Sequence, residues 1–186
     1  RKKKAEETGD KKAMAYSLQC LGNWDANEED GYDNALECYT KSLKIREQLN
    51  DMQGLRKSLN GIGAIYSEKA EYDIALDYFR RVLKINDDIC DNRKIYGCLN
   101  NIGTIYFEKT NYDKALDYYT KSLELSEEDG SISTMGLILA NIGHIQLING
   151  SYENALDYLN RAYKIRKKLG DKPGFVNSLV SIGYIY

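Results

Sequence analysis

Apolar residues recur every three or four positions along two neighbouring stretches of the chain. The first stretch carries Leu55, Leu59, Ile62 and Tyr66. The second, after the short segment 70–72, carries Ala75, Leu76, Phe79, Val82 and Leu83. This spacing puts each set on one face of an α-helix. The pattern therefore predicts two amphipathic helices of roughly 16 to 18 residues, each of which needs a neighbour to bury its apolar stripe.

The same pattern returns every forty residues. A tyrosine precedes an Ala-Leu pair in each unit, at Tyr32, Tyr72, Tyr112 and Tyr152. An Ile-Gly pair keeps the same period, with its glycine at Gly63, Gly103, Gly143 and Gly183. The leading Gly22 is displaced by one residue, which predicts a one-residue insertion in the turn before Tyr32. Repetition at this period predicts a solenoid of helix pairs.

The repeat positions predict how the chain divides. We expect a single array over residues 1–186. Its expected parts are the tail of a preceding repeat at 1–9, four repeats at 10–50, 51–90, 91–130 and 131–170, and the first helix of a truncated fifth repeat at 171–186. Residues 2–10 parallel residues 163–171, so Gly9-Asp10 is expected to end a helix as Gly170-Asp171 does. Further repeats or an effector domain are expected in the parent chain.

The glycine of each Ile-Gly pair falls inside a predicted helix, where it costs about 1 kcal/mol relative to alanine. We expect it on the packed face, opposite the small Ala75, Ala115 or Ala155 of the second helix. Two backbones then approach closely, and packing along the helix pair offsets the cost in helix propensity.

Composition narrows the class of partner. The formal net charge of −2 provides no basic field for nucleic acid or an anionic membrane surface. No apolar run approaches the ~20 residues that span a bilayer. The four cysteines lack metal-ligand spacing, and no apolar leader follows the basic residues 1–4. We therefore expect reduced thiols, a cytoplasmic location, and no contact with nucleic acid or membrane.

Catalytic constellations are missing from the sequence pattern. The GIG and NIG segments lie inside predicted helices and lack the spacing of a nucleotide-binding loop. His144 is the only histidine, which excludes most histidine-dependent triads and any two-histidine metal site. The acidic runs at 28–30 and 127–129 are interpreted as solvated helix ends. We expect a protein that is not an enzyme and that binds no cofactor or metal.

The repeat resembles the tetratricopeptide repeat family over nearly the whole chain. The motif residues in the second unit are Leu59, Ile62, Gly63, Tyr66, Ala75 and Phe79. The third unit has Leu99, Ile102, Gly103, Tyr106, Ala115 and Tyr119. In the fourth unit Gln146 replaces the tyrosine, and the family's closing proline is absent. The forty-residue period is similar to that of kinesin light chains, Leu-Gly-Asn scaffolds, Gram-positive peptide-pheromone receptors, and sensory regions of bacterial kinases and cyclases. The resemblance implies an all-α, right-handed superhelical solenoid of antiparallel helix pairs.

The resemblance also implies a concave groove lined by the first helix of each pair. Its register gives eight candidate groove residues: Lys57, Asn60, Asn100, Asn101, Thr104, Asn141, His144 and Asn177. An asparagine offers a donor and an acceptor at once, which suits an extended peptide backbone. The alternative is that the asparagines only bridge adjacent helices, and that His144 is a plain polar groove residue. Lys57 is the only cation in the groove register, so the family's clamp for C-terminal carboxylates is not reproduced.

These expectations converge on a non-catalytic scaffold whose groove binds a protein or an extended peptide. The alternative is a ligand-sensing regulatory region of a larger signalling protein, such as a kinase, a cyclase or a transcription regulator.

Overall fold

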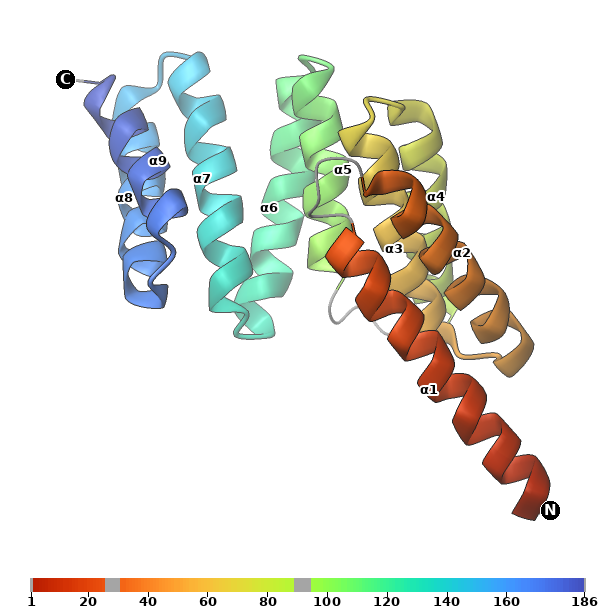
Figure 1. Ribbon diagram of the computed structural model, residues 1–186. Coiled ribbons are helices and arrows are strands. Elements are labelled where there is room, and N and C mark those ends of the chain that lie inside the picture. The colour runs from red at the N-terminus through yellow and green to blue at the C-terminus, as the bar shows by residue number, and fades with distance from the viewer. Residues whose placement is uncertain (1, 26–30, 89–94, 186) are drawn as a thin grey trace. The chain divides into compact units, whose positions relative to one another are not determined.

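The computed structural model describes residues 2–25, 31–88 and 95–185, which form nine helices and no strand (Figure 1). The helices are α1 (Lys2–Asp25), α2 (Tyr32–Leu49), α3 (Met52–Glu68), α4 (Tyr72–Asp88), α5 (Tyr96–Glu108), α6 (Tyr112–Glu128), α7 (Ile132–Ile148), α8 (Tyr152–Leu169) and α9 (Lys172–Gly183). Four of them begin at the repeated tyrosines at 32, 72, 112 and 152. The predicted all-α class is confirmed.

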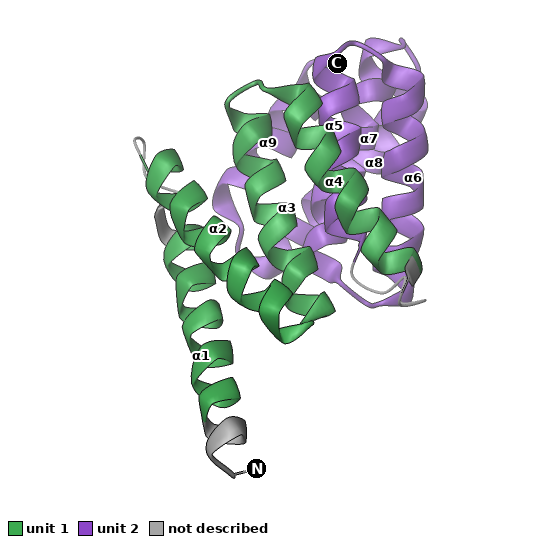
Figure 2. Cartoon of the chain, turned by 90° about the vertical axis from the view of Figure 1, so that its right-hand side faces the viewer, with its two compact units in different colours: residues 1–91 green, residues 92–186 purple. Residues whose placement is uncertain are grey.

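The helices form two compact units, residues 1–91 and 92–186 (Figure 2). In unit 1, α1 packs on α2, α2 on α3, and α3 on α4. In unit 2, each of the helices α5 to α8 packs on the next along the chain. The first helices of successive pairs also touch, α1 with α3 in unit 1, and α5 with α7 and α7 with α9 in unit 2. Each unit is thus built of antiparallel helix pairs, with the first helices forming one layer.

The predicted apolar stripes form the core. In unit 2 the buried cluster contains Ala115, Tyr119 and Leu123 of α6, Ile138, Leu139, Ala140, Ile142 and Ile145 of α7, and Ala162 of α8. Since the cluster spans three helices, α7 contributes to two interfaces at once, which is why its apolar positions surround most of the helix.

The glycines of the Ile-Gly pairs, which we call the seam glycines, lie closest to a different residue from the expected alanine. A Cβ built on Gly103 would lie 2.7 Å from ring atoms of Tyr119, and one on Gly63 would lie 2.7 Å from Phe79. A Cβ on Gly143 would lie 2.8 Å from Leu159. The nearest side chain is therefore not the expected alanine but the bulky residue four positions after that alanine, and the glycine makes room for it.

Helix ends follow a regular chemistry. Asp51 and Asp171 cap α3 and α9, each accepting a hydrogen bond of 3.0 Å from the amide three residues on. Thr110 ends α5 in the left-handed region with φ 56°, where the amides of Thr110 and Asn111 return to the last turn of the helix. Gly150 occupies the equivalent turn after α7 with φ 73°.

An arginine buried to 4% exposure links α2 to the following helix α3. The guanidinium of Arg46 donates to the carbonyl of Gly54, to Ser58 Oγ at 3.2 Å and to Gln19 Oε1 of α1 at 2.7 Å. Arg166, at the equivalent position of α8, donates to the carbonyl of Gly174 in α9 at 2.9 Å. The same residue type at the same register therefore joins a helix pair to the helix after it.

Helix α1 departs from the predicted division. It continues through Gly9 and Asp10, where a helix end is expected, because Gly9 lacks the positive φ that ends α8 at Gly170. A Cβ at Gly9 would also meet nothing within 4 Å in the part of the chain that the structure describes. The predicted insertion falls largely on residues 26–30, and the boundary at 90/91 on residues 89–94, which lie outside the described residues.

Candidate functional site

The candidate groove residues lie on first helices in both units. Lys57 and Asn60 are on α3 of unit 1. Unit 2 holds the other six: Asn100, Asn101 and Thr104 on α5, Asn141 and His144 on α7, and Asn177 on α9. The contacts of α7 with α5 and with α9 place these three helices side by side. We call the surface that they form the first-helix face of unit 2.

Asn100 and Asn141 bridge two first helices. The amide Nδ2 of Asn141 donates to Oδ1 of Asn100 at 3.1 Å, and Asn100 is only 5% exposed. This pair makes the helix-bridging contact that the sequence left open as the alternative role. Asn141 is half-buried and retains one N–H and its carbonyl oxygen for a further partner.

Thr104 is the acceptor for a phenol that crosses the glycine seam. Tyr119 donates to Thr104 Oγ1 at 3.1 Å, and that hydroxyl donates to the carbonyl of Asn100 at 3.1 Å. Unit 1 repeats the arrangement, with Tyr39 donating to Asn23 Oδ1 at 2.5 Å. The residue after the seam glycine thus accepts from a phenol in both cases, a role in packing that the sequence reading did not assign.

His144 follows a seam glycine that faces Leu159, which has no hydroxyl, and reaches instead to α9. Its Nε2 lies 2.9 Å from Ser181 Oγ, whose own proton is donated to the carbonyl of Asn177 at 3.0 Å. Nε2 is therefore the donor in this contact, which leaves Nδ1 as an acceptor. Burial, and then the charge of Arg166, lower the pKa of His144 below 6.5, so the ring is neutral at pH 7.

Several candidate amides have unused hydrogen-bonding capacity. Within the part of the chain that the structure describes, the side chains of Asn101 and Asn177 make no hydrogen bond, and Asn177 is exposed. Oδ1 of Asn60 in unit 1 is buried without a partner. Lys57 is exposed on the same helix. The candidates therefore divide into residues engaged in the fold and residues still able to bind a ligand.

A small pocket opens between α5, α6 and α7. It has a volume of about 130 Å³ and is lined by Thr104, Phe107, Glu108, Tyr119, Asn141 and His144. Three of these were predicted for the groove, whereas Phe107, Glu108 and Tyr119 were not. Phe107 and Glu108 follow Thr104 by three and four residues, the spacing that places residues on one helix face. Extending the groove register by one helical turn beyond Thr104 would have predicted Phe107 and Glu108.

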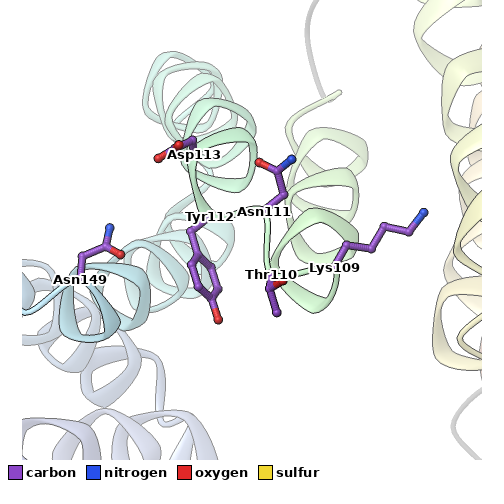
Figure 3. Close-up of a pocket in the computed structure, with 6 residues that line it drawn as sticks. All are labelled: Lys109, Thr110, Asn111, Tyr112, Asp113 and Asn149. Atoms are coloured by element: carbon purple, nitrogen blue, oxygen red, sulfur yellow. The ribbon is translucent and has the colours of Figure 1, made fainter.

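A larger hollow of about 400 Å³ lies at the turn after α5. Figure 3 shows that its side chains diverge: Tyr112 and Thr110 point away from the side taken by Asn111, and Lys109 extends outward. Because the polar groups do not converge on a common point, this hollow is a weaker candidate than the pocket on the first-helix face.

A family model described as tetratricopeptide repeat matches residues 12–88 and 97–168 of this chain. The chain belongs to this family. No curated protein sequence matches it. Among the described residues of this tetratricopeptide chain, no group of three or more histidine, cysteine or acidic residues could hold a metal ion. Nor is any helix there long and apolar enough to cross a membrane.

Solved structures share the tetratricopeptide fold. A Rap protein complexed with competence and sporulation factor matches with a TM-score of 0.78 and 18% identity, over 93% of this chain and 48% of that one. The Rap conjugation gene regulator of plasmid pLS20, in complex with the Phr* peptide, matches with a TM-score of 0.73 and 19% identity, over 92% and 47%. BtubC from P. vanneervenii matches with a TM-score of 0.66 and 14% identity, over 98% of this chain and 82% of that one. The chain thus spans about half the length of these two Rap proteins.

Proposed function

We propose that this tetratricopeptide chain is a non-catalytic protein-interaction scaffold whose first-helix face in unit 2 binds an extended peptide segment. The observation that carries the proposal is the pocket beside Asn141 and His144, which adjoins a face with unengaged amides on α5 and α9. A cytoplasmic location remains a prediction from the sequence.

The size of the pocket favours a peptide over a small-molecule ligand. At about 130 Å³ it falls below the ~300–1,000 Å³ of sites that enclose small molecules and cofactors. It has room for one side chain. An extended peptide presents backbone N–H and C=O groups on either side of such a side chain, and Asn101 and Asn177 can pair with both kinds of group.

The comparisons support a peptide as the partner only by analogy. The Rap regulator of pLS20 is in complex with a peptide, and its fold is similar to that of this chain. A ligand-sensing regulatory region remains the alternative function, since such a region would use the same peptide-binding face.

A titration tests the proposal. A fluorescein-labelled pool of random octapeptides is mixed with the wild-type chain, and binding is followed by fluorescence anisotropy. We expect Asn101→Ala to weaken binding by about fivefold, the effect of losing roughly one hydrogen bond. Asn154→Ala, which removes an exposed asparagine from α8, is the matched control and should bind as the wild type does. Equal affinity of Asn101→Ala and wild type would rule out a role for the Asn101 amide in binding. The absence of any binding would rule out the proposed peptide-binding function.

A further inference from the structure

We infer that the pocket between α5, α6 and α7 receives a basic side chain of the bound peptide, an arginine or a lysine. The inference rests on the proposed peptide-binding function and adds the chemical class of residue that the ligand must carry.

Among the described residues, Glu108 is the only charged group that lines the pocket at neutral pH, and it is exposed at the rim. Burial raises the pKa of Tyr119 to about 12, so its phenol stays protonated, and His144 is neutral as described above. Glu108 forms no ion pair within the described residues, and its charge reaches Tyr119, where it contributes to the raised pKa. The pocket therefore holds a carboxylate with no cation of its own.

The cation whose charge reaches His144 already has partners. The charge of Arg166 reaches His144, but its guanidinium donates to the carbonyl of Gly174 at 2.9 Å and its Nε lies 3.9 Å from Asp171. Arg166 does not line the pocket. The exposed carboxylate of Glu108 is therefore open to a cationic side chain of a ligand.

The remaining lining groups suit a cationic donor. Asn141 uses Nδ2 to bind Asn100, so its carbonyl oxygen is available as an acceptor, and Nδ1 of His144 is a second acceptor. Phe107 and Tyr119 add aromatic character to the lining, and aromatic rings attract a nearby cation. A carboxylate side chain would instead be repelled by Glu108, and an apolar one would desolvate Glu108 and leave it unpaired.

Three labelled octapeptide pools test the inference. They are identical and random except for one fixed central residue, which is arginine, norleucine or glutamate. Anisotropy titrations use the wild-type chain, Glu108→Gln, and the control Glu124→Gln, which removes an exposed carboxylate of α6 outside the pocket. We expect the arginine pool to bind wild type about tenfold more tightly than the glutamate pool, and Glu108→Gln to lose about tenfold for the arginine pool alone. Glu124→Gln should match the wild type with every pool.

A second measurement locates the bound residue. His144 is the only histidine, so its ring protons give separate NMR signals for the pocket. The arginine pool should shift them and the glutamate pool should not. Equal binding of all three pools would overturn the inference and leave the proposed function standing, whereas no binding of any pool would overturn both. An arginine preference that survives in Glu108→Gln would also overturn the assignment to this pocket.

Discussion

At the scale of single residues, the seam glycines are places where a side chain has no room. A Cβ on Gly103 would lie 2.7 Å from the ring of Tyr119, which is buried and held by its hydrogen bond to Thr104. Gly103→Ala should therefore lower the free energy of unfolding by about 1–2 kcal/mol, because overpacking outweighs the better helix propensity. Urea denaturation measures the change.

Gly97 provides the matched control in the same helix. A Cβ there would meet none of the described residues within 4 Å, so Gly97→Ala should stabilise the protein by up to about 1 kcal/mol. If Gly103→Ala proved as stable as Gly97→Ala, the close contact with Tyr119 would not be the reason for the glycine.

The single histidine predicts a pH dependence with a definite sign. Because the folded-state pKa of His144 is below 6.5, its contribution to stability is fully present above pH 6.5 and is lost as the pH falls through the folded pKa. An NMR titration of the native ring should give a midpoint below that of the urea-unfolded chain. Between pH 7 and 5, His144→Gln should lose less stability than wild type. A native midpoint at or above 6.5 would contradict the burial of the neutral ring.

At the scale of elements, the buried arginine is the contact that joins one helix pair to the next helix. Arg46→Ala removes the donor to Gly54, Ser58 and Gln19 and takes one hydrogen bond from each of these acceptors. We expect a loss of about 3 kcal/mol in thermal or urea unfolding. Lys44→Ala, at an exposed position of the same helix, should change stability by less than about 0.5 kcal/mol. A similar small effect for Arg46→Ala would show that the guanidinium bonds do not stabilise the joint.

The turn after α5 contains a residue in an unfavourable conformation. Thr110 has φ 56°, which costs roughly 1–2 kcal/mol for a side chain with a Cβ, whereas Gly150 meets the same requirement without strain. Thr110→Gly should raise the unfolding midpoint, and Gly150→Thr should lower it. A Thr110→Gly variant less stable than wild type would mean that other contacts of the threonine outweigh the backbone strain.

The elements could be predicted from the sequence because one pattern repeats. The forty-residue period places the starts of α2, α4, α6 and α8 at their tyrosines, and the apolar stripes identify the buried faces. Gly9-Asp10 misled because a Gly-Asp pair ends a helix only where the glycine takes positive φ, as Gly170 does with φ 72°. The sequence could not show that Asn100 is bonded to Asn141, nor that Tyr119 reaches the pocket, because both depend on contacts between helices.

At the scale of the whole molecule, each compact unit contains its own first-helix layer, and the pocket belongs to unit 2 alone. Its lining comes from three consecutive helices that pack on one another. The proposed binding face therefore needs the register of successive repeats more than any single motif.

The most direct measurement follows the ring signals of His144 by NMR while the arginine-containing octapeptide pool is added. We predict that these signals shift and saturate in parallel with the anisotropy of the labelled pool, and that the side-chain amide of Asn141 moves with them. The amide of Asn154 on α8 should stay unchanged. Saturable peptide binding that left His144 and Asn141 unmoved would place the peptide elsewhere and contradict the assignment of this face.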